Sequence, residues 1–194
     1  MLRRSRLLVT MALLVMISTP LAGFAAGRPE WGDPSKRVWY RSQLVPFGEL
    51  LDKGVVPHCH DGLGPGIITC YDTKEELVAA TGADLSGVDR AEVERLRASG
   101  AVTQVQGDWY ACVWEGIGLT GRSFLLQHDE YRDFQEILFD NITSSIEIPA
   151  GAGYSTYYAE PGYEGGNWAF CTTKTDLSLY GFDNMISSAR KGYY

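Results

Sequence analysis

Two six-residue segments of the chain carry nearly the same oxygen-bearing side chains. Residues 140–145 and 183–188 both follow the pattern Asp-Asn-x-x-Ser-Ser. Carboxylate, amide and hydroxyl oxygens are the donors that hard divalent cations accept. The same side chains also bond nearby backbone groups, so a single copy would favour a capped turn. Because both copies keep the whole pattern, the pair favours cation binding.

The segments before these turns are also alike, and this indicates a tandem duplication. When Gly121 is aligned with Gly165, both copies have an aromatic residue seven positions earlier and a glycine three positions earlier. The oxygen-rich turn begins 19 residues after Gly121 and 18 residues after Gly165. The matched positions in the two copies are Trp114 with Tyr158, Gly118 with Gly162, and Leu119 with Tyr163.

This repeated pattern resembles the βγ-crystallin family, in which two Greek-key motifs pair into one β-sandwich. The resemblance covers residues 108–194, a little under half of the chain. It implies a mainly β protein whose two-motif Greek-key β-sandwich is preceded by a small α+β region. Leu119 stands where the family usually has Tyr or Phe, so we expect the first hairpin to be held less tightly.

The same resemblance implies calcium as the ligand, because this turn marks the calcium-binding members of the family. Each site would also take oxygen from the first hairpin of the opposite motif, near Glu115 and near Ala159 or Glu160. One Asp in each turn gives a low ligand charge, so we expect an affinity of roughly micromolar to millimolar. The implied ligands within the turns are the side chains of Asp140, Asn141, Ser144, Asp183, Asn184 and Ser187 and the carbonyls of Ile142 and Met185.

The first 25 residues have the features of an export signal. Arg3, Arg4 and Arg6 precede a short apolar run over residues 7–17, and small residues near Ala25 fit a cleavage site. The apolar run is too short to span a bilayer comfortably, and no later stretch could do so. We therefore expect a secreted protein without a membrane span.

Removal of residues 1–25 takes away three arginines and no acidic residue. The remainder has 14 basic and 24 acidic residues and a formal charge of −10. This charge argues against nucleic acid and anionic membranes as partners. The expected partners are calcium and either a secreted protease or a cell-surface component. Residues 26–107 would form an N-terminal α+β region of unknown role, ahead of the crystallin-like domain at 108–194.

Within the N-terminal region, glycines and prolines divide the chain into short elements. Residues 26–45 predict a loose lead-in, because charges and prolines are scattered along them. Residues 47–54 predict a short helix and residues 67–71 a short strand. Residues 101–106 have the pattern of an extended segment.

Two helices with clear end signals lie between these segments. Thr73 and Glu76 have the spacing of a capping box, and Ser86 and Asp89 repeat that spacing before the second helix. Glycines can adopt the left-handed conformation that ends a helix. The expected terminators are Gly82 and Gly100.

Four cysteines lie in the exported part, where oxidation is the default. Cys59 and Cys70 flank a glycine-rich loop, and a local disulfide between them is the plain expectation. Cys112 and Cys171 both fall in the β region and could form the second bridge, although the sequence leaves three pairings open.

The histidines beside Cys59 raise the alternative of a zinc site with Cys70. We favour the disulfide, because zinc competes poorly with oxidation in a secreted chain. His58 and His60 are then expected to be loop residues, and His128 a surface residue.

No motif of a known catalytic type occurs in the chain, so an enzyme is the least supported class. The leading hypothesis is a secreted calcium-binding protein with a structural or binding role. The alternative is a secreted peptidase inhibitor, because several small bacterial inhibitors resemble the same fold.

Overall fold

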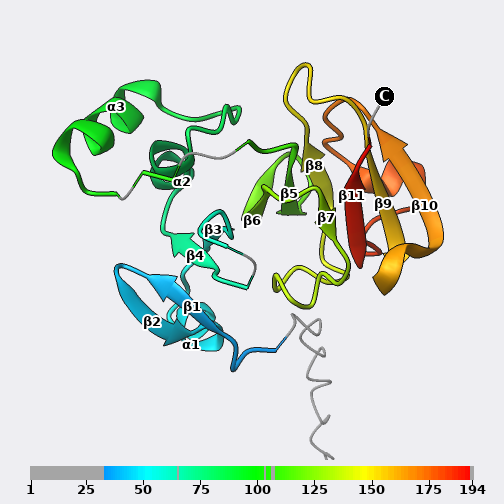
Figure 1. Cartoon of the computed structure of the whole chain (residues 1–194), viewed down its shortest axis with the longest axis horizontal. Helices are drawn as coiled ribbons and strands as arrows, with labels where there is room; N and C mark the ends of the chain where they lie inside the picture. Colours follow the sequence, from blue (N-terminus) through cyan, green and yellow to red (C-terminus); the bar gives the residue numbers. More distant parts are fainter. Residues whose placement is uncertain (1–32, 65, 103, 106–107, 193–194) are drawn as a thin grey trace, which may run out of the picture.

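The computed structural model describes residues 33–192 except 65, 103, 106 and 107, and it contains two β-sheets (Figure 1). The predicted export signal and residues 26–32 lie outside the described residues. Within the described part of the chain, no helix is long and apolar enough to span a bilayer. The expected mainly β fold is confirmed, since seven strands form one sheet and four form the other.

The first element is a hairpin, where the sequence predicted a loose lead-in. Strand β1 (Arg37–Tyr40) pairs antiparallel with β2 (Gln43–Pro46). The turn residues Arg41 and Ser42 have φ values of 48° and 62°. This is the geometry of a tight hairpin turn, for which Asn-Gly is the usual sequence. The prediction was wrong because Arg-Ser gives no turn signal and each strand has only four residues.

Of the next three elements, the helix and the second strand fall close to their predicted positions, whereas the first strand was not predicted. Helix α1 (Phe47–Asp52) is followed by a left-handed Gly54, with φ 73°. Strands β3 (His58–His60) and β4 (Thr69–Tyr71) are antiparallel neighbours. Cys59 lies opposite Cys70 in this pair, and the predicted disulfide between them is confirmed.

Helix α2 (Lys74–Thr81) begins at the predicted cap but with a different partner for Glu76. The Thr73 hydroxyl accepts a hydrogen bond from the Glu76 amide at 3.2 Å. The Glu76 carboxylate accepts from the Asp72 amide at 2.9 Å, one residue earlier than in a capping box. Gly82 ends the helix in the left-handed conformation, as expected.

Helix α3 (Arg90–Ser99) is capped by Asp89, whose carboxylate accepts from the Ala91 amide at 3.0 Å. Ser86 lies outside the helix, and its amide donates to the Glu147 carboxylate at 2.6 Å. The expectation of a Ser86 cap was therefore wrong, whereas Gly100 does end the helix.

The segment predicted to be extended after α3 is irregular at its described positions, 101, 102, 104 and 105. The Val105 amide donates to the Ala80 carbonyl at 2.7 Å, so the segment attaches to α2. It forms no strand there because its backbone bonds with a helix end instead of a neighbouring strand.

Among its described residues, the C-terminal region contains strands and two short 3₁₀ helices but no α-helix. This agrees with the β-sandwich that the resemblance implies for residues 108–194. The elements are β5 (Ala111–Gly116), β6 (Thr120–Leu126), β7 (Glu130–Tyr131), β8 (Ser145–Glu147), β9 (Ser155–Glu160), η1 (Pro161–Tyr163), β10 (Glu164–Phe170), η2 (Leu177–Tyr180) and β11 (Ser188–Lys191).

These strands form two motifs, and each motif contributes one segment to the sheet of the other. The first motif supplies β5, β6 and β8 to the larger sheet, whereas its β7 pairs with β11 in the smaller sheet. The second motif supplies β9, β10 and β11 to the smaller sheet, and its Lys174 bridges Ile146 at the edge of the larger one. This arrangement is the Greek-key sandwich that the family resemblance implied.

The larger sheet continues into the N-terminal region. Its strand order is β2-β1-β4-β3-β6-β5-β8, and β3 pairs parallel with β6. The predicted domain boundary lies between residues 107 and 108. The strands on either side of this boundary belong to the same sheet.

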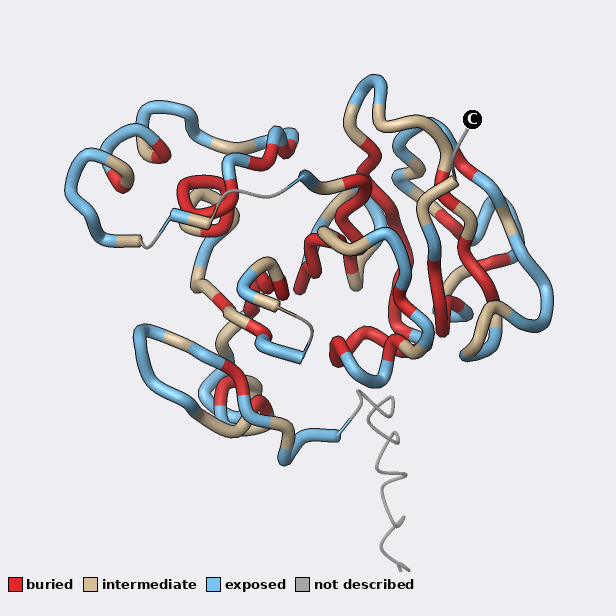
Figure 2. The backbone as a smooth tube through the Cα atoms, viewed as in Figure 1, coloured by how far each residue is buried: buried red, intermediate tan, exposed pale blue. Residues whose placement is uncertain are grey.

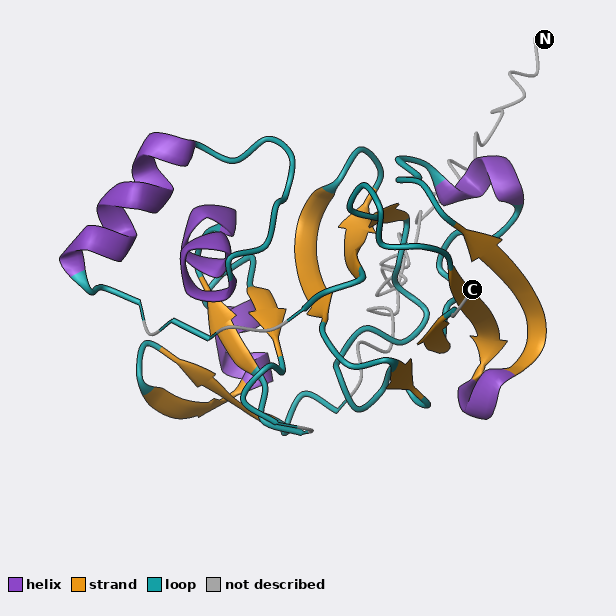
Figure 3. Cartoon of the chain, turned by 45° about the horizontal axis from the view of Figure 1, so that its top comes forward, coloured by secondary structure: helices purple, strands orange, loops and turns teal. Residues whose placement is uncertain are grey.

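Two apolar clusters hold the layers together, and Figure 2 shows the buried residues along the facing strands. The main cluster lies between the sheets and includes Phe124, Ile146 and Tyr157. The second lies between the larger sheet and α2 and α3, which lie together at one end of the molecule (Figure 3), and it includes Leu77 and Trp114.

The predicted second disulfide does not form, because Cys112 and Cys171 are both free. Cys112 is buried in the cluster beneath the helices, on the face of the larger sheet that points away from the smaller sheet. Cys171 is exposed, directly after β10 of the smaller sheet. A whole sheet separates the two thiols.

Candidate functional site

The two oxygen-rich turns have the same backbone conformation and bond to each other. Asn141 and Asn184 are left-handed, with φ values of 53° and 54°, and Asn tolerates this conformation better than most residues. The Asn141 amide donates to the Ile186 carbonyl, and the Asn184 amide donates to the Thr143 carbonyl, both at 2.9 Å. The two motifs are thus related by an approximate two-fold arrangement about these turns.

Each turn also presents a serine to the asparagine of the other turn. The Ser144 hydroxyl donates to Asn184 Oδ1 at 3.4 Å, and the Ser187 hydroxyl donates to Asn141 Oδ1 at 3.2 Å. The oxygen donors are therefore grouped across the motifs: Ser144 lies with Asn184, and Ser187 lies with Asn141.

The first hairpin of each motif is tied to these serines by its backbone. The Ser144 amide donates to the Trp114 carbonyl at 2.8 Å, and the Ser187 amide donates to the Tyr158 carbonyl at 2.9 Å. Glu115 follows Trp114, and Ala159 follows Tyr158. The hairpin residues that the sequence suggested as ligands are therefore adjacent to the residues that accept these hydrogen bonds. The structure thereby brings turn and hairpin together in both copies.

The second serine of each turn fixes the fold of the hairpin. The Ser145 hydroxyl donates to the Gly116 carbonyl at 2.6 Å, and the Ser188 hydroxyl donates to the Glu160 carbonyl at 2.7 Å. Ser145 also accepts from the Leu119 amide, and Ser188 from the Tyr163 amide, both at 3.1 Å. Leu119 thus keeps the backbone contact that Tyr163 makes.

The aspartates of the two turns have unsatisfied oxygens. Asp140 Oδ1 and Asp183 Oδ1 are both inaccessible to solvent, and neither has a hydrogen-bond partner among the described residues. Within the described ranges, the other oxygen of each carboxylate accepts only from the side-chain amide of the adjacent asparagine, at 3.1 Å. A buried carboxylate oxygen is costly unless a partner satisfies it, so these two oxygens are free to accept a donor or to coordinate a cation.

Other aspartates show how a capped turn looks in the same chain. Asp33, Asp133 and Asp176 each accept a hydrogen bond from the backbone amide two residues later, at 2.8–2.9 Å. Asp140 and Asp183 accept from no backbone amide in the described structure. The capped-turn interpretation of the sequence therefore does not account for these two carboxylates.

The two sites differ in their surroundings. The Glu115 carboxylate forms an ion pair with the buried Arg122 at 2.9 Å, so its side chain is engaged. Glu160 is exposed. Ile142 is buried, whereas its counterpart Met185 is 41% exposed. Sequence reasoning missed Arg122, because its pairing with Glu115 joins two strands of a hairpin at an irregularity in their register.

The predicted zinc alternative is contradicted, because both of its cysteines are in the disulfide. Across the described ranges, three or more His, Cys, Asp or Glu side chains do not gather as a metal cluster. Any cation at the turns must therefore draw on amide, hydroxyl and carbonyl oxygens as well.

His58 and His60 are not loop residues but lie in strand β3, both buried. Burial lowers the pKa of each to about 4. His58 Nδ1 bonds with the Ser123 hydroxyl at 2.9 Å, and His60 Nδ1 with Gln127 Oε1 at 3.0 Å. His128 is half-buried rather than fully exposed, with Nε2 3.6 Å from the Asp61 carboxylate.

No family model and no curated protein matches the chain. Solved structures of βγ-crystallin domains are similar to it in fold. The Ciona intestinalis βγ-crystallin is 19% identical with a TM-score of 0.39, and covers 42% of this chain and 98% of its own. An archaeal βγ-crystallin is 23% identical with a TM-score of 0.37, and covers 44% of this chain and 100% of its own.

A βγ-crystallin domain from Clostridium beijerinckii is also similar, at 18% identity and a TM-score of 0.37, and it covers 42% of this chain and 94% of its own. At these identities the likeness concerns the fold alone. The topology described above makes the C-terminal region a two-motif Greek-key sandwich.

Proposed function

We propose that the Greek-key domain binds calcium at its paired turns. The observation that carries this proposal is the pair of buried, unpartnered oxygens, Asp140 Oδ1 and Asp183 Oδ1. Each belongs to a turn whose asparagine oxygen meets a serine hydroxyl of the other motif. A cation between these groups would satisfy the carboxylate oxygens that no protein donor reaches.

The residues present fit calcium by their chemistry. Calcium accepts six to eight oxygens from carboxylates, amides, hydroxyls, carbonyls and water. One site would draw on Ser144, Asp183 and Asn184, with carbonyls from Met185 and the Glu115 hairpin. The other would draw on Ser187, Asp140 and Asn141, with carbonyls from Ile142 and the hairpin at Ala159 or Glu160.

We expect the role of calcium to be structural. Each site joins the two motifs, so a bound cation would tie the sheets of the sandwich together. Calcium at about one hundred times its dissociation constant would stabilise the fold by about 2.7 kcal/mol. Export, if the first 25 residues act as a signal, would bring the protein to an environment where weak extracellular calcium modules function.

Calorimetric titration of the chain without residues 1–25 tests the proposal. We expect calcium to bind at two sites and to raise the melting temperature. The variant with Asp140→Ala and Asp183→Ala should lose both effects. Asp133→Ala and Asp176→Ala are matched controls, because these aspartates cap turns through the backbone and should leave calcium binding intact.

The absence of both binding heat and a melting shift at millimolar calcium would overturn this function. The peptidase-inhibitor alternative stays a prediction, because no contact among the described residues singles out an inhibitory loop. A panel of secreted metallo- and serine proteases, assayed with and without calcium, tests it. A binding or structural role, rather than an enzymatic one, is the proposal that the paired turns support.

A further inference from the structure

One face of the larger sheet is covered by helices at one end and open at the other. Cross-strand pairing places one residue from each strand in a single row on this face. The row begins at the open end and consists of Leu44, Trp39, Thr69, His60, Leu125, Cys112 and Glu147.

The exposure of this row changes abruptly along the sheet. From His60 onward the residues are at most 5% exposed beneath α2 and α3, whereas Trp39 is 42% and Leu44 41% exposed. Trp39 belongs to neither apolar cluster. Trp39 lies opposite Leu44 and shares a cavity lining with Leu63, which is 53% exposed. Contiguous exposed apolar side chains, unlike single scattered ones, mark binding surfaces.

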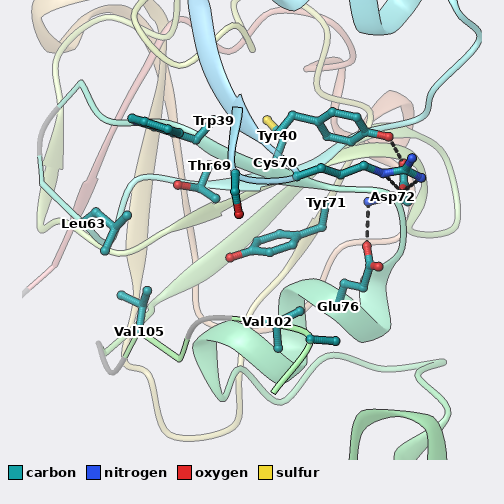
Figure 4. A pocket seen from close by; sticks show the side chains of 13 residues that line it. Trp39, Tyr40, Leu63, Thr69, Cys70, Tyr71, Asp72, Glu76, Val102 and Val105 are labelled. Atoms are coloured by element: carbon teal, nitrogen blue, oxygen red, sulfur yellow. Dashed lines mark hydrogen bonds and ion pairs between the residues drawn. The ribbon is translucent and has the colours of Figure 1, made fainter. Parts of the chain in front are cut away.

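Trp39 lies on a cavity of about 310 Å³ (Figure 4). Tyr71 forms part of the floor, and its ring is stacked on His60 at 5.8 Å between centroids. Leu63, Val102 and Val105 lie across from the sheet as the opposite wall. This volume is at the small end of the range for ligand pockets.

Polar groups gather at the other end of the cavity. Asp72 accepts hydrogen bonds from the Tyr40 hydroxyl and, at 2.5–3.0 Å, from the Arg41 guanidinium. Glu76 uses one carboxylate oxygen for the Asp72 amide, and Thr69 Oγ1 in the lining is without a partner. Figure 4 shows Asp72 and Glu76 close together, away from Trp39 and Leu63.

The charges in the lining nearly cancel, since one Arg faces one Asp and one Glu. A ligand of high charge of either sign would therefore gain little here. Donors and acceptors stand side by side at the polar end, which suits hydroxyl groups, because a hydroxyl both donates and accepts. The indole of Trp39 offers a flat apolar face for the C–H side of a ring.

From these features we propose that the cavity beside Trp39 is a binding site for a neutral saccharide. The sugar ring lies against Trp39, and its hydroxyls bond with the Glu76, Asp72 and Arg41 side chains. The site is separate from the oxygen-rich turns, so the binding does not depend on calcium.

A glycan array followed by calorimetry with cellotetraose, chitotetraose and mannotetraose tests the site, with EDTA present throughout. We expect at least one glycan to bind. Trp39→Ala should weaken it by about tenfold or more through loss of ring stacking and apolar contact. Glu76→Gln should weaken it less, because the amide keeps an acceptor. Leu179→Ala is the control, since Leu179 is 78% exposed and is not in the cavity lining.

Unchanged melting temperatures of the variants establish that they are folded. Absence of glycan binding, or Trp39→Ala binding as tightly as the parent, overturns the proposal. So does Trp39-dependent binding of an extended peptide library without any glycan, which would make the cavity a peptide site. If the chain binds a glycan but does not bind calcium, the saccharide site is supported and only the calcium-binding function proposed above is overturned.

Discussion

At the scale of single residues, the two turns show how similar side chains take different roles. The first serine of each turn faces the other motif, whereas the second serine holds the hairpin of its own motif. Ser144 and Ser145 are adjacent in sequence and are both buried. The assignment of roles follows from the side of the backbone on which each side chain lies.

The cross-motif grouping predicts which substitutions act on the same calcium site. Ser144→Ala and Asn184→Ala should be coupled in their effect on calcium affinity, because their oxygens are 3.4 Å apart. Ser144→Ala and Asn141→Ala should act on different sites and be additive. A double-mutant cycle measured by calorimetric titration checks both pairs. If Ser144 is coupled to Asn141 and not to Asn184, the cross-motif grouping of the ligands is contradicted.

The buried histidines predict a loss of stability in mild acid. The pKa of His58 and His60 is about 4 in the folded chain, and about 6.5 in the unfolded chain. Between these values the unfolded state binds more protons, so the free energy of unfolding falls as the pH falls. The slope should be up to about 1.4 kcal/mol per pH unit for each histidine.

Asp61 acts in the opposite direction, since burial raises its pKa and it binds a proton more readily when folded. Urea denaturation between pH 7 and 4.5 measures the net slope. His60→Gln should remove about half of the histidine contribution. An unchanged slope in that variant would show that His60 does not hold a depressed pKa.

At the scale of elements, the helix ends and the local disulfide follow the chemistry of the nearby sequence, whereas the start of α3 does not. Both helices end at the glycines expected, and the Cys59–Cys70 bridge joins β3 to β4. The start of α3 differs by three residues, because Ser86 is drawn to Glu147 in β8 of the larger sheet. A tertiary contact therefore decides between two residues that could both cap a helix.

This displacement predicts unequal costs for two similar substitutions. Asp89→Ala should lower the free energy of unfolding by about 1 kcal/mol, because the Ala91 and Glu92 amides lose their acceptor. Ser86→Ala should be nearly neutral, since its contact with Glu147 uses the backbone amide. Urea titrations compare the two. A larger loss for Ser86→Ala would contradict the assignment of the cap.

At the scale of the whole molecule, one sheet runs through both halves of the chain. β3 pairs with β6, and the helices cover Cys112, Trp114 and Leu125 of the Greek-key region. The main cluster also contains residues from both halves, among them Val38 and Phe47 with Phe124. The N-terminal region therefore completes the core of the β-sandwich rather than lying beside it.

This shared core predicts that residues 108–194 do not form a stable domain alone. Truncation would expose the edge of β6 and the apolar side chains beneath α2, which favours aggregation. The chain without residues 1–25 should unfold in a single calorimetric transition. A soluble, cooperatively folded fragment 108–194, or two separate transitions in the longer chain, would contradict this prediction.

The sequence by itself determined the features that depend on local spacing. The duplication, the two turns, the helix-ending glycines and the bridge around the glycine loop are all expressed within short stretches, where one residue type has one dominant conformation or partner. The fold of the C-terminal region was expected from the family resemblance that these local features carry.

Only the tertiary structure decided which groups meet over long distances. It separates Cys112 from Cys171 by placing them on different sides of a sheet, and it buries His58 and His60 in a strand too short to show a pattern. It also groups Ser144 with Asn184 and leaves Trp39 uncovered. These outcomes depend on strand register and on which face each helix covers, and neither is contained in the spacing of residues along the chain.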